Sequence, residues 1–599
     1  MAESLKNVTA QLSEHGAVNH ILSLSIGQAV FQHGLLRLEV AYEGLFPDSQ
    51  KLASEQIGGL IGQTLELDWG SKTYGDEKPF YGIVTGVQHE GLGKTPNRLE
   101  LEVSAPTTLL SGEAYSQCHV DQSPNDIFSA TCEQEQFNRF ASKAKLTANS
   151  TLTDKLPLSM RVNETSWNYL RRLASSTGNL LYYEGDELVF GPPKKAPIKL
   201  GIADVEDFAV SFQCSPVQGR YSHFDYDQAK IEQKDHGKTP VPSAKSVSDY
   251  ADLNRSIMGR PDQSGWVKPS LFPSERDKGG LEKKLDEARF DQHKPRLAQY
   301  TLTTSHPGIR VGMELTAEHI LKDDGLIVMS IQHSVEGKQY QNILNAIPAS
   351  CYGSATGNFR APKVSSMVAT VADHADPQQM GRIKVSFPWD AGKQTPWLRM
   401  VTPSAGAGRG HYFVPEIGDE VVVAFEMDNI DAPFVTGPLY NGKAKFDRHY
   451  DAENNVKAIS TRSGHEIIFD DGNKKLIIQN EKNSITLDFN SKGEIIINSD
   501  GPILINSGDT ITMAAEKDIQ LSAQNIKLEA QQKVSAAGTE IDINGQQKAV
   551  MKSAAIEVSS SAGGTKIASQ TKVDIKGTAA TTVESSGMTT IKGMMVKLN

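Results

Sequence analysis

The chain has 599 residues, 38% of them hydrophobic, and its 50 glycines bring the apolar share close to that of ordinary globular proteins, which excludes wholesale disorder. A chain of this length predicts about three or four domains. The formal net charge of −11 argues against a general nucleic-acid-binding protein, because phosphate contacts require a surplus of lysine and arginine.

The N-terminal segment, residues 1–27, lacks the basic stretch and following apolar stretch of a secretory signal peptide. The chain also has no run of about 18 apolar residues that would predict a membrane-spanning helix. Its four cysteines are scattered without a CxxC pair, which fits reduced thiols in a cytosolic product better than a zinc site or a disulfide framework. We therefore expect a route of export other than the general secretory pathway, if the protein leaves the cell.

Residues 1–225 are predicted to form an α+β domain in which strand pairing dominates. Apolar and polar residues alternate in 35–40, 64–69 and 98–103, as in half-buried strands. Residues 165–179 instead have helical spacing, with Trp167, Leu170, Leu173 and Ala174 on one face and Gly178 as the stop. The next segment, 180–191, is predicted to be a hairpin that turns at Gly185-Asp186.

The amino-acid composition changes in residues 226–295, which we interpret as an insertion. The stretch QKDHGKTPVPSAKSVSDY (233–250) is polar and contains prolines, and it is typical of a mobile loop. Residues 279–293 are a helix candidate with a charged, solvated face. Strand patterns then resume and continue to about residue 350.

A linker at 351–364 introduces a compact all-β unit. Five or six short strands separated by turn residues follow up to residue 442, which is the size of a small barrel. Residues 464–480 then predict a hairpin that turns at 471–473.

The last segment, 490–599, has no Trp, Tyr, His, Arg or Cys and repeats apolar anchors at steps of seven or eight. Such a period indicates stacked repeats, and pairs of β-branched residues two positions apart favour strands over a coiled coil. One octad provides only a single face, so three octads of one chain or one octad from each of three chains must close the core. The residues predicted to form this core are Ile503, Ile505, Ile511, Met513, Ile519, Leu521, Ile526, Leu528, Ile541 and Ile543.

Motifs of catalysis or metal binding are weak throughout the chain. GHEIIF (464–469) lacks the second histidine of a zinc-protease motif, and GAGRG (406–410) precedes no helix that could bind phosphate. Cys118-His119 has no third partner nearby in the sequence. We expect no cofactor, no metal and no enzymatic activity.

Several blocks of the chain resemble VgrG spike proteins of type VI secretion systems and related spikes of contractile-tailed phages. The strongest likeness is in 360–480, with the blocks GRIKVSFPWD (381–390), TPWLRMVTPSAGAGRG (395–410), VPEIGDEVVVAFEMDNIDAPFVTGPLYNG (414–442) and SGHEIIFDDGNKKLIIQN (463–480), and a looser likeness includes NETSWNYLRRLASSTGNLLYYEGDELVFGPP (163–193). The chain departs from the family at Arg409-Gly410 and in the polar stretch of the insertion.

The resemblance implies a mainly β chain with three parts. Residues 1–355 would form an α+β phage-hub-like domain with two barrel-like lobes, 360–445 an OB-like β-barrel, and 446–599 a hairpin followed by a triple-stranded β-helix needle. The needle would be formed by a homotrimer. No effector domain is expected beyond the needle.

The resemblance also implies a function and partners. The trimer would be the structural spike of a contractile injection tube, would puncture target membranes in a transient contact, and would carry effectors or adaptors. Its hub would sit on a hexameric inner-tube protein among baseplate components, and a PAAR-type tip protein would dock on Met594, Met595, Val596, Lys597, Leu598 and Asn599. It would be cytoplasmic during assembly and then exported. A baseplate hub of a phage or an extracellular injection particle is the alternative, and a β-helical glycan-cleaving enzyme is a more distant one.

Overall fold

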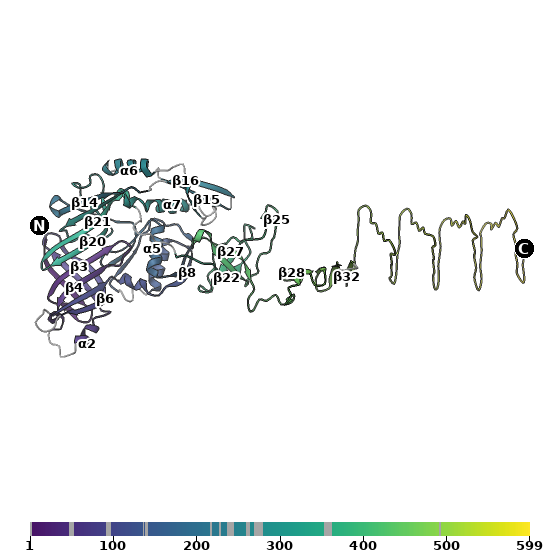
Figure 1. The fold of residues 1–599 in the computed structure, drawn as a ribbon, viewed down its shortest axis with the longest axis horizontal. Helices are drawn as coiled ribbons and strands as arrows, with labels where there is room; N and C mark the ends of the chain where they lie inside the picture. Colours follow the sequence, from purple (N-terminus) through teal and green to yellow (C-terminus); the bar gives the residue numbers. More distant parts are fainter. Residues whose placement is uncertain are drawn as a thin grey trace. The chain divides into compact units, whose positions relative to one another are not determined.

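The computed structural model of the protein divides into two compact units (Figure 1). The first contains Met1–Ile459 and Ile468–Lys475, and the second contains Ser460–Ile467 and Leu476–Asn599. The structure describes residues 3–46, 53–90, 97–135, 137, 142–215, 219–226, 229–236, 245–258, 264–268, 280–352, 362–489 and 493–598.

Eight strands at the start and end of the hub close into a barrel, which we call the first lobe. Their order is β20-β3-β4-β7-β6-β5-β1-β21, and β21 pairs with β20 to complete the circuit. The strands are β1 (Glu3–Leu12), β3 (Ile21–Ala29), β4 (Leu35–Ala41), β5 (Thr64–Ser71), β6 (Gly75–Glu90), β7 (Arg98–Ser104), β20 (Leu326–Glu336) and β21 (Gln339–Pro348), with β2 (Gly16–Val18) paired to β1.

The alternating pattern of the sequence fills this barrel. Leu38 lies opposite Leu101 and Val40 opposite Leu99 in the antiparallel pair of β4 and β7, and all four side chains are buried. Because side chains alternate across a strand, the charged residues between them point outward. The three strands predicted in 35–103 are therefore confirmed.

A second group of strands continues from β20 and β21, and among the described strands it ends in two unpaired edges. β19 pairs with β20 and carries the edge strand β13, whereas β18 pairs with β21 and carries the edge strand β14. These strands are β13 (Lys194–Lys199), β14 (Val205–Phe212), β18 (Ala298–Thr304) and β19 (Met313–Thr316). Together with β20 and β21 we call them the second lobe.

The middle of the hub contains the helix and hairpin expected from the sequence. Helix α5 (Ser166–Ser176) begins after the capping side chain of Thr165 and buries Trp167 and Leu170, and Gly178 follows it with a φ of +74°. Glycine suits this left-handed position at a helix end. The other elements here are β8 (Tyr115–Gln122), α3 (Pro124–Gln134), β9 (Lys145–Ala148), β10 (Leu156–Glu164), β11 (Leu180–Tyr183) and β12 (Glu187–Gly191).

The insertion has more regular structure than its composition suggested. Its stretch 233–250, expected to be a loop, includes the end of a strand and the start of helix α6, because apolar residues recur at helical spacing from Tyr250 onward. The expected helix in 279–293 is confirmed as α7. The elements are β16 (Lys230–His236), α6 (Lys245–Met258), β17 (Ser264–Lys268) and α7 (Leu281–Asp291). Strands β16 and β17 pair with β15 (Gly219–Asp225), which directly precedes the insertion, in a sheet of order β16-β15-β17.

The OB barrel follows as six short strands, in agreement with the sequence. Four of them form a sheet of order β23-β22-β26-β27, and β24 pairs with β25 in a small hairpin. The strands are β22 (Met367–Asp373), β23 (Lys384–Ser386), β24 (Ala405–Gly406), β25 (Arg409–Gly410), β26 (Glu420–Phe425) and β27 (Pro433–Leu439).

Short helices complete the first unit. They are α1 (Tyr42–Leu45), α2 (Ala53–Gly58), η1 (Pro106–Ser111), η2 (Ile202–Asp204), η4 (Lys294–Arg296), η5 (Ala349–Cys351) and η6 (Glu426–Asp428). Among the described helices, none combines the length and the apolar character needed to cross a bilayer.

The last strands lie around the start of the second unit. The turn expected at 471–473 follows β29, where the Asp470 carboxylate accepts the backbone N–H of Asn473 at 2.9 Å. In the antiparallel pair of β31 and β32, Ile485 lies opposite Ile497. The strands are β28 (Val456–Ser460), β29 (Glu466–Asp470), β30 (Lys475–Gln479), β31 (Asn483–Asp488) and β32 (Glu494–Ser499).

Beyond β32 the chain forms a succession of wide, open windings (Figure 1). None of the residues 501–598 is assigned to a strand, and all are exposed. The octads were expected to be strands, and in one chain they are not, because no neighbouring strand lies beside them to complete the hydrogen-bond ladder.

Candidate functional site: assembly surfaces

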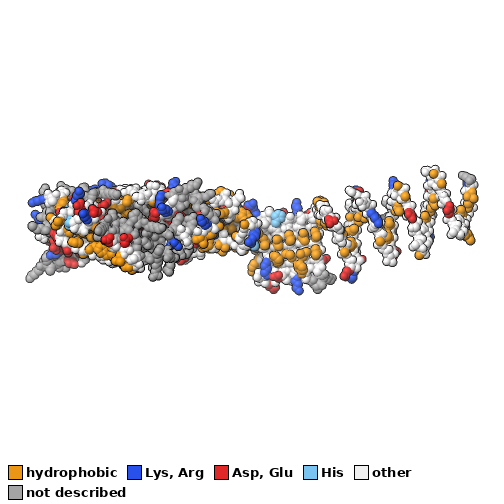
Figure 2. Space-filling view, turned by 90° about the horizontal axis from the view of Figure 1, so that it is seen from above, with side chains coloured by type: hydrophobic (Ala, Val, Ile, Leu, Met, Phe, Trp, Pro, Cys, Tyr) orange, Lys and Arg blue, Asp and Glu red, His pale blue; other side chains and the backbone are white. Residues whose placement is uncertain are grey.

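The ten predicted core residues of the needle are all exposed in the single chain. In each pair the first side chain is 52–55% exposed and the second is 60–82% exposed. Figure 2 shows hydrophobic side chains repeating along the windings. The exposed residues are Ile503, Ile505, Ile511, Met513, Ile519, Leu521, Ile526, Leu528, Ile541 and Ile543.

Polar contacts within the described part of the needle are local. The hydrogen bonds in 501–598 join residues at most three positions apart, such as Ser560 Oγ to the carbonyl of Gly563 at 2.8 Å. The ion pairs Lys527–Glu529 and Lys572–Asp574 are also local. In the described structure, successive windings of one chain therefore do not form hydrogen bonds or ion pairs with each other, unlike the coils of a single-chain solenoid.

The predicted tip site is an exposed, apolar chain end. The exposed fractions are 109% for Met594, 83% for Met595, 50% for Val596 and 85% for Leu598. Lys597 is exposed as well, and Asn599 lies outside the described residues. The structure places these side chains next to one another only because they are consecutive.

A junction between hub and OB barrel is built on two aspartates that the sequence did not single out. Asp390 Oδ2 accepts the backbone N–H of Cys118 in β8 at 2.6 Å, and Asp431 Oδ1 accepts that of Met160 in β10 at 2.8 Å. The Lys393 ammonium donates to the Cys118 carbonyl at 3.3 Å. Side chains of β8 and β10 also share a hydrophobic core with barrel strands. No local motif marks these aspartates, because their partners are more than 270 positions away in the sequence.

Helix α5 reinforces the junction through the buried side chain of Arg172. Its guanidinium donates to Glu164 Oε2 at 3.0 Å and to the Met160 carbonyl at 2.6 Å, and it lies 3.5 Å from Asp431 Oδ2. Burial lowers the pKa of Arg172, but the charges of Asp431 and Glu164 outweigh this effect and the net pKa is raised. The arginine therefore stays charged and joins a hub helix, a hub strand and a barrel loop.

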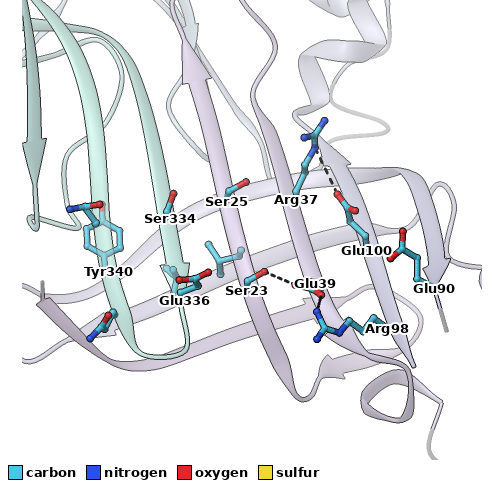
Figure 3. A pocket seen from close by; sticks show the side chains of 14 residues that line it. Ser23, Ser25, Arg37, Glu39, Glu90, Arg98, Glu100, Ser334, Glu336 and Tyr340 are labelled. Atoms are coloured by element: carbon cyan, nitrogen blue, oxygen red, sulfur yellow. Dashed lines mark hydrogen bonds and ion pairs between the residues drawn. The ribbon is translucent and has the colours of Figure 1, made fainter. Parts of the chain in front are cut away.

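The outer face of the first lobe forms a shallow polar concavity of about 550 Å³ (Figure 3). Glu39 is one of the lining residues, and its carboxylate accepts from Ser23 Oγ at 2.9 Å and pairs with Arg98 at 2.6 Å. Arg37 lies 4.0 Å from Glu100. Ligand pockets are usually lined by apolar groups, whereas polar and charged side chains dominate the lining of this concavity.

The Cys118 thiol and the His119 ring, which are adjacent in the sequence, are both buried. Burial raises the pKa of the Cys118 and Cys132 thiols far above the ordinary value and that of Cys351 to about 12, so these thiols stay protonated. Burial also lowers the pKa of His119, so Cys118-His119 is not a thiolate–imidazolium pair. Within the described ranges, no group of three or more His, Cys, Asp or Glu side chains is placed to hold a metal ion.

Comparisons with known proteins agree with this architecture. Residues 36–339, just over half of the chain, match the phage tail baseplate hub (GPD) family, and residues 367–440 match the type VI secretion system/phage-baseplate injector OB domain. A solved structure of a PdpA–VgrG complex in its lidless form has a TM-score of 0.51 at 10% identity, covering 83% of this chain and 99% of that one, which is a likeness of fold.

Curated relatives include spike proteins of Pseudomonas aeruginosa. The type VI secretion system spike protein VgrG2a is 37% identical over 84 residues, covering 13% of this chain and 10% of the relative. VgrG5 is 25% identical over 336 residues, covering 47% of this chain and 40% of the relative. The matches thus span less than half the length of these relatives. The closed first lobe, the OB barrel and these matches together establish that the chain belongs to the phage tail baseplate hub family and resembles VgrG spikes.

Proposed function

We propose that this chain is the subunit of a homotrimeric spike of a type VI secretion or related contractile injection tube. The observation that carries the proposal is the needle, whose apolar pairs are exposed and whose polar bonds are local in one chain. Three copies would bring one octad each to every level and would cover these side chains. The relatives that are named as type VI secretion system spike proteins support the role of a spike.

The needle is suited to transmit force. Strands of three chains would satisfy the backbone groups at every level, and closure of the three sheets would leave no free edge. Small outward side chains keep the shaft narrow. Load from the hub would pass through the junction at Asp390 and Asp431, which holds the OB barrel to the hub by partly buried hydrogen bonds.

The partners follow from this position. We propose that the hub sits on a hexameric inner-tube protein among baseplate components, that a PAAR-type tip protein docks on the chain end at Met594–Asn599, and that effectors or adaptors travel with the spike. The trimer would assemble in the cytoplasm and be exported by contraction, with a transient contact with the target membrane. Its role would be mechanical, without catalysis, cofactor or nucleic acid.

The native mass of the full chain tests the trimer. We expect a species of about three times 65.2 kDa that resists detergent. The double variant Ile511→Asp/Ile519→Asp, which places carboxylates in the predicted core, should be monomeric, because a buried unpaired charge is strongly destabilising. The matched control Thr512→Asp, at a position between two core residues and on the opposite face of a strand, should remain trimeric. A wild-type monomer would contradict the proposal.

A baseplate hub of a phage or an extracellular injection particle is a second candidate, favoured by the match of residues 36–339 to the phage tail baseplate hub family. The trimer would be the same in both cases. Purification of the particle that contains the chain separates them, because an extracellular particle is released with its sheath and a type VI apparatus stays anchored in the producing cell.

A further inference from the structure

The edge strand β14 carries an apolar stripe that lies uncovered in the single chain. Phe208, Val210 and Phe212 are 52%, 41% and 41% exposed. The residues between them are Ala209 and Ser211, so one face of the strand is apolar and the other is small or polar. Exposed apolar stripes on a free sheet edge are unusual in a protein that works alone, because they promote pairing with other chains.

The stripe extends the buried face of the second lobe. Phe208 lies opposite Leu302, Val210 opposite Tyr300 and Phe212 opposite Ala298 in the antiparallel pair of β14 and β18. Directly opposed side chains point to the same face of a sheet. The three partners in β18 are at most 4% exposed. On this face of the sheet, the side chains of β18 are therefore buried and those of β14 are exposed. The stripe is thus the exposed rim of the core of the second lobe.

Helix α6 of the insertion widens this rim. Asn254 fixes the helix to the end of β14, donating to the Ser215 carbonyl at 2.7 Å and accepting the Ser215 N–H at 2.8 Å. The Tyr250 ring lies 5.0 Å from that of Phe212. Leu253 and Ile257, which share the Tyr250 side of the helix at helical spacing, are 55% and 58% exposed. Figure 1 shows α6 and β14 at the same rim of the hub.

We infer that this rim, formed by Phe208, Val210 and Phe212 of β14 and by Leu253 and Ile257 of α6, is the contact between the hubs of two copies of the chain. The inference rests on the proposed trimer. Permanent interfaces between copies are apolar and resemble a divided core, whereas transient contacts with cargo are more polar. The needle already requires permanent neighbours of the same kind, joined to the hub by the same chain.

The symmetry of a trimer defines the type of contact. Pairing of β14 with β14 of another copy would be two-fold and would stop at a dimer, so the rim must meet a different patch of the next copy, and three such contacts close a ring. The insertion then has a role, because α6 supplies two of the five apolar side chains of the rim.

Cys214 provides a reporter for this contact. It follows β14, accepts a hydrogen bond from the Tyr250 hydroxyl at 3.8 Å, and is exposed, whereas Cys118, Cys132 and Cys351 are buried. In the full-length trimer we expect Cys214 to react with a maleimide at least tenfold more slowly than in the monomeric variant Ile511→Asp/Ile519→Asp. Peptide mass spectrometry would locate the label, with the three buried cysteines as internal references.

Two variants sharpen the test. Phe208→Arg should leave the mass of the needle-held trimer unchanged but return Cys214 to the reactivity of the monomer. Ala209→Arg, one position away on the polar face, should leave Cys214 protected. A trimer in which Cys214 reacts as fast as in the monomer would overturn the inference and leave the proposed function standing, whereas a wild-type monomer would overturn both. Protection that appears only after a cell lysate is added would assign the rim to another protein and would also overturn the inference.

Discussion

Replacement of Arg172 by methionine tests whether buried ion pairs hold the OB barrel on the hub. Methionine keeps most of the volume of the side chain but removes the charge and every donor. Glu164 and Asp431 then lose the guanidinium that lies 3.0 Å and 3.5 Å from their carboxylates. Because Glu164 and Arg172 are less than 10% exposed, water cannot replace the lost contacts.

The expected cost is at the lower end of the range for breaking a buried ion pair, about 3 kcal/mol. The lower end of this range applies because the Asp431 side chain is 25% exposed and still accepts the hydrogen bond from the Met160 backbone N–H. A change of this size corresponds to about a 100-fold higher population of the locally opened junction. The destabilisation should be confined to the junction and should not reach the needle.

Hydrogen exchange of the full chain, read by mass spectrometry, measures this opening. Amides of β10 and of the barrel loop around Asp431 should exchange about 100-fold faster in Arg172→Met. The matched control is Arg171→Met. Arg171 precedes Arg172 on α5 and donates to Asn168 Oδ1 in an exposed hydrogen bond at 3.3 Å, so its replacement should cost about 0.5 kcal/mol or less. Equal exchange in the two variants would refute the idea that Arg172 holds the junction.

Two further predictions concern the OB barrel and the hub. Burial raises the pKa of Asp376, but its hydrogen bonds from Arg382 at 2.7 and 3.0 Å and from backbone amides outweigh this and lower the net pKa. Its contribution to stability should therefore be complete above about pH 4 and be lost at lower pH. Thermal unfolding of Asp376→Asn should therefore show a smaller loss of stability in acid than the wild type does, and equal pH profiles would contradict this. Gly312→Ala should destabilise the hub by about 3 kcal/mol or more, because the new Cβ would lie 2.3 Å from the Tyr182 ring at a φ of +79°. Gly337→Ala, also at positive φ (+59°) but in open space, should cost only about 1 kcal/mol in chemical denaturation, and equal costs for the two variants would exclude the steric argument.

The elements that could be predicted from the sequence are those whose signal is local. Helix α5 was predicted because Trp167 and Leu170 are close in sequence and fall on one helical face. Helix α6 had a similar signal in Tyr250, Leu253 and Ile257, but the prolines and polar residues before it suggested a loop. In that stretch the helical spacing was more informative than the overall composition.

The elements that could not be predicted depend on distant residues. Strand alternation indicates which side chains are buried but not that β20 and β21 close the first lobe with strands from the other end of the hub. The contacts of Asp390 and Asp431 likewise depend on the position of the whole barrel. The octads are an intermediate case, since their period is visible in the sequence, but residues 501–598 have no strand assignment in the single chain.

The local bonding of the needle has a consequence for its length. Because each octad of 501–598 contacts only its own neighbours along the chain, whole octads can be gained or lost without any change in the hub. A single inserted residue is different, since it would turn every later apolar side chain to the opposite face. The reach of the shaft is therefore a quantity that evolution or design can adjust in steps of one repeat.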